Sequence, residues 1–241
     1  GPHGACRSDK HDKRSFPDAL PESGVSRFAV SGPVLFVAGL VALTGLVALP
    51  GDLPAQPTSV TVGVTLGATV SNQSWQPSVR TSTRDGVLGG AYAEVALPGG
   101  KVSVRAGAEY VQRGAFVHED RSGLPVDGEI RAEYVSFPIH AKITKTLGPV
   151  RVYVSGGPTV DQSFRTRTDP VLAQALDQES ATVVSLAVGG GIGLLISDRF
   201  QPEVEVRWTE GLSQAFAGSF TTVRNRSLEI LFRVGMLKTP N

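Results

Sequence analysis

Apolar and polar residues alternate along most of the chain between about residue 59 and residue 238. The last segment is the clearest, with Leu228, Ile230 and Phe232 interleaved with residues such as Glu229 and Arg233. Because successive side chains of a β-strand point to opposite faces, this spacing predicts a strand with one apolar wall and one polar wall. A soluble sheet buries its apolar wall in a core, whereas a membrane barrel turns that wall toward lipid. The wall that faces inward therefore decides the class of protein.

The same alternation predicts eight strands, at about residues 59–70, 86–97, 101–116, 129–145, 150–160, 181–196, 200–211 and 227–237. Their connections alternate in length: the predicted loops at 71–85, 114–128, 161–180 and 212–226 are long, and the others are tight turns. Within the longest loop, the segment from Pro170 to Glu179 is predicted to form a short helix with proline in its first turn. Hairpins that cross an outer membrane produce this alternation, with short periplasmic turns and longer outer loops. Each predicted strand is also long enough to cross, since a tilted strand needs about 9–11 residues.

Most charged residues of these segments fall on the polar wall. An Arg or Lys that faces lipid at the bilayer midplane costs about 2–4 kcal/mol. Opposite charges inside a narrow barrel can instead pair with one another. We therefore predict a structural charge network in the lumen. Arg151 is predicted to lie on the same polar wall. The members of this network are Glu94, Arg105, Glu109, Arg113, Lys142, Glu203, Glu205, Arg207, Glu229 and Arg233.

The N-terminal part divides into two predicted segments. Residues 1–26 are polar and aperiodic, which predicts a disordered leader or a misassigned start, with Val25 as an alternative start position. Residues 27–56 begin with Arg27, continue as an apolar run to Leu49 and end in a small-residue, proline-containing stretch, which predicts a secretory signal peptide. An uncleaved anchor is the alternative, because the run is as long as a membrane-spanning helix. Residues 57–241 form the predicted barrel domain.

Composition narrows the picture only slightly. A formal net charge of +1 in 241 residues gives no electrostatic case for nucleic-acid binding. Cys6 is the single cysteine, so an intramolecular disulfide is impossible. Aromatic residues make up 7% of the chain, and Tyr110, Phe116 and Trp208 fall near the predicted outer rim, where a thin aromatic girdle would lie.

Four patterns carry a chemical interpretation beside a structural one. Gly189, Gly191 and Gly193 have nearly the spacing of a dinucleotide-binding loop, but the following residues continue a strand where that loop needs a helix. We interpret them as small residues that leave room inside a narrow barrel. Glu203 and Glu205 share one face, which suits an acid–base pair, but a lumen ladder of ion pairs with Arg207, Arg233 and Arg105 is favoured.

The histidines are the remaining candidates. His140 has no Ser and Asp partners at a spacing that identifies a hydrolase triad. His118, Glu119 and Asp120 stand in a predicted outer loop, where a solvated charged loop is favoured over a cation site. No catalytic, cofactor-binding or metal site is therefore predicted.

Several short motifs follow one another in a fixed order: Gly63–Gly67 (GVTLG), Glu109–Ala115 (EYVQRGA), Glu133–Ile139 (EYVSFPI), Ser155–Pro158 (SGGP), Gly189–Gly193 (GGGIG), and Glu203–Trp208 (EVEVRW) with Gly211–Leu212. In their order and spacing the chain resembles the PorT-like outer-membrane β-barrel domain family, which is related in architecture to small OmpA-type barrels. The similarity covers about Val60 to Leu237. It implies an eight-stranded barrel in the outer membrane of a diderm bacterium, inserted by the barrel-assembly machinery. It does not imply a catalytic activity. One departure is the ending Leu237-Lys-Thr-Pro-Asn241, where that machinery usually meets an aromatic residue.

The resulting prediction is an all-β protein: an eight-stranded antiparallel up-and-down transmembrane β-barrel with an N-terminal signal helix. It is placed in the bacterial outer membrane, in contact with outer-membrane lipid, and is given a structural role or a binding role through its outer loops. An extracellular or periplasmic partner would be of unknown identity. Because an eight-stranded barrel is filled by its own side chains, a wide pore is not expected. The alternatives are a small outer-membrane hydrolase using Glu203, Glu205 or His140, and a periplasmic lipocalin-like binder of an apolar ligand.

Overall fold

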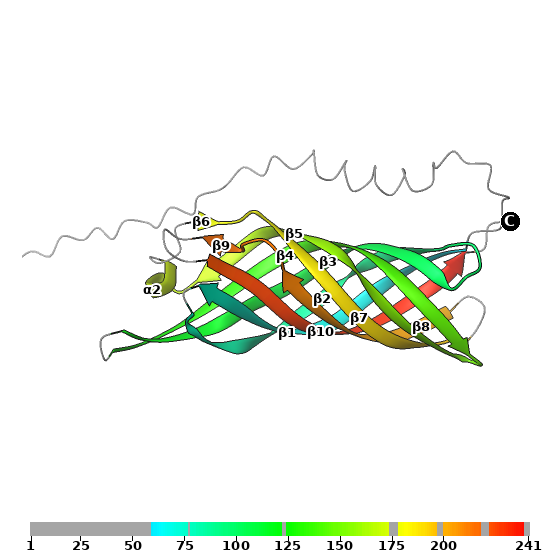
Figure 1. Ribbon diagram of the computed structural model, residues 1–241, viewed down its shortest axis with the longest axis horizontal. Coiled ribbons are helices and arrows are strands. Elements are labelled where there is room, and N and C mark those ends of the chain that lie inside the picture. The colour runs from blue at the N-terminus through cyan, green and yellow to red at the C-terminus, as the bar shows by residue number, and fades with distance from the viewer. Residues whose placement is uncertain are drawn as a thin grey trace, which may run out of the picture. The chain divides into compact units, whose positions relative to one another are not determined.

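Eight long antiparallel strands close into a ring in a computed structural model of the chain (Figure 1). The structure describes residues 59–76, 78–121, 124–173, 178–196, 200–217 and 222–238, so the predicted leader and signal peptide lie outside the described residues. Each strand pairs with the next long strand in the chain, and the last pairs back with the first, which confirms the predicted up-and-down barrel. The long strands are β1 (Val60–Gln76), β2 (Arg80–Ala96), β3 (Val102–Arg121), β4 (Leu124–Leu147), β5 (Val150–Thr168), β7 (Thr182–Leu194), β8 (Phe200–Gly211) and β10 (Thr222–Lys238).

Three short elements lie at the end of the ring that carries the long connections. They are α2 (Pro170–Ala173), β6 (Gln178–Glu179) and β9 (Phe216–Ala217). Strand β9 pairs with the start of β10 on one side and with β6 on the other. The predicted helix at 170–179 is therefore wrong in length, because Gln178 and Glu179 form a strand that pairs with β9. No helix within the described ranges is long and apolar enough to cross a membrane.

The strands extend farther than predicted at the long-connection end. The predicted loops at 71–85, 114–128, 161–180 and 212–226 are therefore too long, since much of each is strand. The backbone ladder between β1 and β10, for example, continues beyond the apolar alternation from Ser71 opposite Ser227 to Gln76 opposite Thr222. Backbone hydrogen bonding needs no apolar outer wall, so strands continue where the outward face is polar. At the opposite end the turns are tight, and Gly99, Gly100 and Gly148 adopt positive φ angles of 89°, 66° and 61° there.

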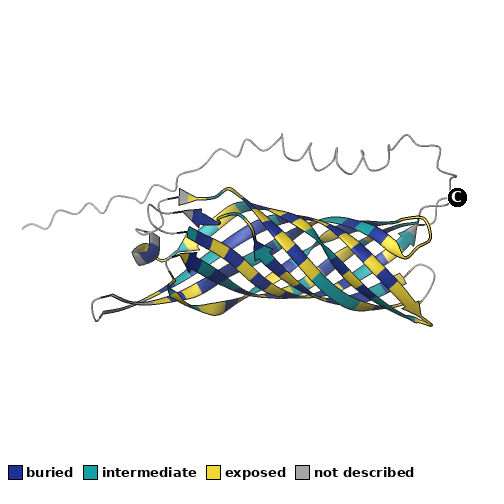
Figure 2. Ribbon diagram, in the orientation of Figure 1, coloured by how far each residue is buried: buried dark blue, intermediate teal, exposed yellow. Residues whose placement is uncertain are grey.

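The polar wall faces the lumen and the apolar wall faces outward. Buried and exposed residues alternate along each strand, which gives the ring a chequered appearance (Figure 2). On β10, Phe232 is 49% exposed while its neighbour Arg233 is 1% exposed. The outward apolar stretch of β10 spans nine residues, Leu228 to Met236, close to the 9–11 that a membrane-crossing strand needs. A lipocalin-like barrel would need the opposite arrangement, so that alternative is excluded.

Two of the three predicted rim aromatics are exposed on the outward wall. The side chains of Phe116 and Trp208 are exposed, whereas Tyr110 is half-buried with its ring centroid 5.9 Å from that of Phe164. The outward apolar residues form a band around the ring, which we call the apolar belt. Its exposed large members include Val62, Val64, Leu66, Val70, Val87, Ile139, Ile143, Val154, Leu186, Val188, Ile192, Val204, Val206, Trp208, Leu228, Ile230, Phe232 and Met236.

Candidate functional site

The inward walls bring the predicted charged residues into contact, and the group nearer the tight-turn end is centred on Arg105. Arg105, on β3, donates to Glu94 of β2 at 2.6 and 2.9 Å and to Glu203 of β8 at 2.6 Å. A third carboxylate, that of Glu205, lies 3.2 Å from Arg105 Nη1. The guanidinium also lies over the ring of Tyr92, 4.9 Å from its centroid. One cation therefore links carboxylates that come from opposite sides of the ring.

Two further cations complete this group. Lys142, on β4, places Nζ 2.5 Å from Glu203 and 3.3 Å from Glu94, and 4.1 Å from the ring centroid of Tyr153. Arg233, on β10, forms an ion pair with Glu205. The group then holds three carboxylates and three cations, which balances the charge in a region shielded from water. Such balance is required because an unpaired buried charge is strongly unfavourable.

A second group lies toward the long-connection end. Arg207, on β8, donates to Glu109 at 2.7 Å and to Glu229 at 2.5 Å. Arg113, on β3, lies 3.2 Å from Glu229 and donates to Asp161 at 2.5 Å. Asp161 also accepts hydrogen bonds from the hydroxyls of Ser136 and Ser185. All ten residues of the predicted network are buried, and each makes an ion pair with an oppositely charged member or with Asp161.

Asp161 and Arg151 differ from what the sequence indicates. Asp161 belongs to this interior although it falls in a predicted loop, because β5 continues to Thr168. The signal was available, since Ser155, Thr159 and Asp161 keep the two-residue polar spacing of the inner wall. Arg151 is half-buried and donates to the amide oxygen of Gln201 at 2.7 Å, so it contacts an amide where the other network members contact carboxylates or cations.

The two histidines that were candidates for chemistry contact neighbouring polar side chains of the barrel. His140 is buried and its Nε2 lies 3.4 Å from Thr159 Oγ1. His118 lies 2.7 Å from Asp127 and 2.9 Å from the hydroxyl of Ser82. Within the described ranges, no three His, Cys, Asp or Glu residues gather in a way that could hold a metal ion.

Glycines on the inner wall make room for two tyrosine rings. A Cβ atom at Gly191 would lie 2.6 Å from the hydroxyl oxygen of Tyr153, and one at Gly63 would lie 2.7 Å from the ring of Tyr92. Gly235, opposite Gly63, would meet the Tyr92 hydroxyl at 2.6 Å. The glycine series of β7 thus lies in a strand and faces ring and carboxylate neighbours, as the structural interpretation requires.

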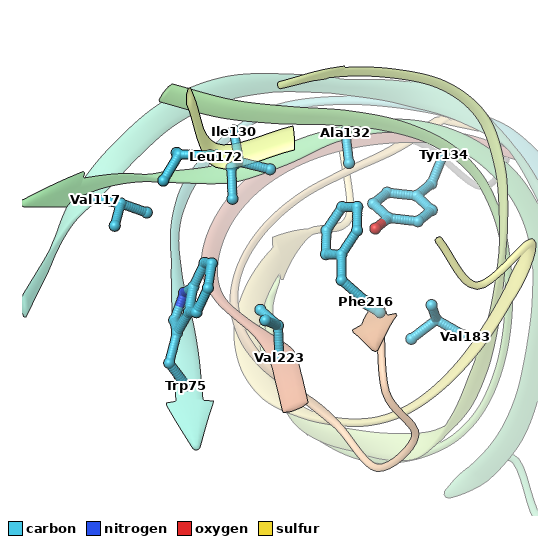
Figure 3. Close-up of a cluster of buried hydrophobic side chains, with 10 residues drawn as sticks. Trp75, Val117, Ile130, Ala132, Tyr134, Leu172, Val183, Phe216 and Val223 are labelled. Carbon is cyan, nitrogen blue, oxygen red and sulfur yellow. The ribbon is translucent and has the colours of Figure 1, made fainter. Parts of the chain in front are cut away.

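An apolar cluster lies inside the ring at the long-connection end, and we call it the outer cap (Figure 3). In Figure 3 the side chain of Phe216 on β9 points toward Tyr134, and Trp75 lies on the side of Val223. Asn225 donates a hydrogen bond to the Tyr134 hydroxyl at 2.9 Å and accepts one from the side chain of Gln73 at 3.2 Å. Polar side chains therefore contact the outer cap on its lumen side. Its members are Trp75, Val117, Ile130, Ala132, Tyr134, Leu172, Val183, Ala215, Phe216 and Val223. The sequence prediction missed it, because several of these residues fall in predicted loops.

Comparison with known proteins identifies one matching family. The model of the outer membrane protein beta-barrel domain matches residues 54–217. Among solved structures, Neisserial surface protein A shares 12% identity with a TM-score of 0.43, and the alignment covers 73% of this chain and 96% of that one. Ail, the attachment invasion locus protein of Yersinia pestis, shares 14% identity with a TM-score of 0.37, covering 74% and 99%. The outer membrane protease OmpT from Escherichia coli shares 10% identity with a TM-score of 0.40, covering 78% and 99%. No curated protein matches the chain.

Proposed function

The chain belongs to the outer membrane protein beta-barrel domain family, and from this premise we propose that it serves the bacterial outer membrane as a closed, non-enzymatic barrel that binds a partner through its long-connection end. The PorT-like assignment within this family, export by a signal peptide at residues 27–56 and insertion by the barrel-assembly machinery are part of the same proposal. In this orientation the tight turns are periplasmic and the long-connection end is extracellular.

The observation that carries the proposal is the filled interior. Arg113, Lys142, Glu229 and Arg233 are each less than 2% exposed although they line the lumen. Above them the outer cap places apolar side chains across the ring (Figure 3). A barrel of eight strands has an interior just wide enough for side chains. Ion pairs then hold the strands together across the lumen, and the side chains of the described residues leave no wide aqueous path for solutes.

A catalytic role for the interior carboxylates is disfavoured by their contacts. Glu203 contacts both Arg105 and Lys142, and Glu205 contacts Arg105 and Arg233. A general acid or base must reach the proton that it transfers, and these carboxylates are 4% and 1% exposed. Replacing both with glutamine should leave any hydrolase activity measured for the full chain unchanged. Loss of such an activity, with the fold retained, would favour the enzyme alternative.

The binding surface is proposed at the strand extensions beyond the apolar belt. The β3–β4 hairpin projects farthest (Figure 1). Strands β3 and β4 pair with each other up to Arg121 opposite Leu124. Their outer neighbours stop earlier, because β2 pairs with β3 only up to His118 and β5 pairs with β4 only from Ile130. Over this projecting part, no described strand pairs with either outer edge. At its base, Glu129 accepts a backbone hydrogen bond from Asp169 N and donates one to the Asp169 carboxylate. Free strand edges offer backbone donors and acceptors to an added strand of a partner.

Planar-bilayer recording tests the closed barrel. The purified full chain should give no stepwise openings at 100 mV, because ion pairs and the outer cap fill the lumen. A variant with Arg105, Glu203 and Glu205 all changed to alanine keeps the second charge group and the outer cap, so it should also remain closed. Sustained openings of the unaltered protein would overturn the proposal.

A further inference from the structure

The outward wall changes from apolar to polar along one line on three adjacent strands. Leu228 of β10 pairs with Val70 of β1 and with Trp208 of β8, and all three are exposed apolar side chains. One outward position farther on, Arg226 pairs with Asn72 and with Glu210. Tryptophan is enriched where hydrocarbon meets the polar headgroups. The line therefore marks the edge of the hydrocarbon layer on this part of the barrel.

A polar hollow of about 100 Å³ lies directly beyond this line. Its six lining residues are all polar or charged: Ser74, Gln76, Glu210, Thr222, Arg224 and Arg226. Arg226 donates through Nε to Glu210 at 2.7 Å, which fixes the guanidinium while its terminal amino groups remain available. Arg224 is exposed and forms no ion pair with another described residue. Two guanidiniums against one carboxylate leave the hollow with one excess positive charge.

We propose that this hollow binds the phosphate-bearing headgroup of an anionic lipid in the adjoining leaflet. Guanidinium groups match phosphate geometry through paired hydrogen bonds, and basic residues beside a membrane attract anionic lipids. The hydroxyls of Ser74 and Thr222 can donate to the remaining phosphate oxygens. Glu210 repels a phosphate and so limits the approach to the side of the two arginines.

Position favours a lipid over a free anion. The hollow opens beside the apolar belt, where Leu228, Ile230 and Phe232 follow one another along β10 with 39%, 53% and 49% of their surface exposed. Acyl chains attached to the bound headgroup would continue along these side chains. A soluble phosphate would gain only the polar contacts. This site lies on the outer surface, so it goes beyond the closed-barrel proposal and does not depend on a closed lumen.

The test measures, by native mass spectrometry, how much lipid the detergent-purified full chain retains. The probes are bisphosphorylated lipid A, the same lipid after removal of its phosphates, and inorganic phosphate. Arg224→Gln combined with Arg226→Gln should lower the affinity for lipid A at least about tenfold, because two charge-assisted contacts are lost. Arg167→Gln, an exposed arginine of β5 outside the hollow, is the matched control and should leave the affinity unchanged.

The outcomes separate the possibilities. The proposal is supported by two results together. The double variant keeps its heat-modifiable gel mobility but loses lipid A, and the dephosphorylated lipid binds only weakly to the unaltered protein. Equal binding by the folded double variant and the unaltered protein overturns it, as does equal binding of the dephosphorylated lipid. If inorganic phosphate binds as tightly as lipid A, the ligand is a free anion and the lipid proposal falls.

Discussion

Arg105→Met should be a costly single change in the barrel interior. Methionine keeps the length of the side chain and removes the cation that three carboxylates share. Arg105 donates four hydrogen bonds to Glu94, Glu203 and Glu205, at 2.6 to 3.2 Å, and is 5% exposed. Without it the interior group keeps three negative charges and two positive ones.

The magnitude follows from the contacts that remain. Hydrogen bonds to charged groups contribute about 1.5–3 kcal/mol each, so a simple sum over the four would be far too large. Lys142 still contacts Glu94 and Glu203, and Arg233 still contacts Glu205. Removing one partner of a buried ion pair typically costs about 3–5 kcal/mol, and that is the expected loss in the free energy of unfolding. Adding Glu203→Gln should restore part of it, because the second change removes the excess negative charge.

Urea unfolding followed by tryptophan fluorescence measures this loss, with Arg226→Met as the matched control. Arg226 also pairs with a glutamate, Glu210, but on the outer surface, where the two side chains are 48% and 35% exposed. An exposed ion pair contributes about 0–1 kcal/mol, so the control should lose no more than that. If both variants lose the same small amount, the interior pairs do not stabilise the barrel and the reasoning is refuted.

Three further changes test other parts of the structure. Gly191→Ala places a Cβ 2.3 Å from the Val204 carbonyl oxygen and should lower the free energy of unfolding in urea by about 1–3 kcal/mol. The outward Gly190→Ala, whose new Cβ would have its nearest atom at 3.3 Å, should be tolerated. Equal costs for the two variants would contradict a crowded lumen. Val204→Arg, at the middle of the apolar belt on β8, should lower the free energy of unfolding in lipid vesicles by about 2–4 kcal/mol. Val204→Ile should leave it unchanged. An arginine variant as stable as the unaltered protein would contradict lipid contact at this position. Phe216→Ala should speed amide hydrogen exchange in β9 and at the start of β10 and leave the belt region of β10 protected; a uniform loss of protection would show that the outer cap is not a separate unit.

The alternation predicted strands best where the two walls meet opposite environments. Strand β8 runs from Phe200 to Gly211, as predicted, because lipid on one side and a charged lumen on the other keep its pattern strict. Beyond Val70 the outward residues of β1 are Asn72, Ser74 and Gln76, so the pattern ends while the backbone ladder continues. Pattern reading therefore recovers the membrane-crossing part of each strand and not its extension.

The inward position of the charged residues was predictable, and so was a ladder of Glu203 and Glu205 with arginines, but most of the individual contacts were not. Arg105 contacts Glu203, which lies 98 residues away in the chain and on a strand that is not its neighbour in the sheet. Such contacts depend on closure of the ring and on the stagger of its strands, which no local pattern contains. The outer cap was missed for the same reason, since Phe216 and Leu172 reach it only through short elements folded over the mouth.

The two tryptophans allow the most direct test of which wall faces lipid. Trp208 lies on the outward wall and is 47% exposed, whereas Trp75 lies in the outer cap and is 8% exposed. Each can be studied alone, in a Trp75→Phe or a Trp208→Phe variant, after reconstitution into vesicles of lipids with brominated acyl chains. The inside-out barrel predicts strong quenching of Trp208 and little quenching of Trp75. Quenching of Trp75 with Trp208 protected would contradict the proposed orientation of the two walls.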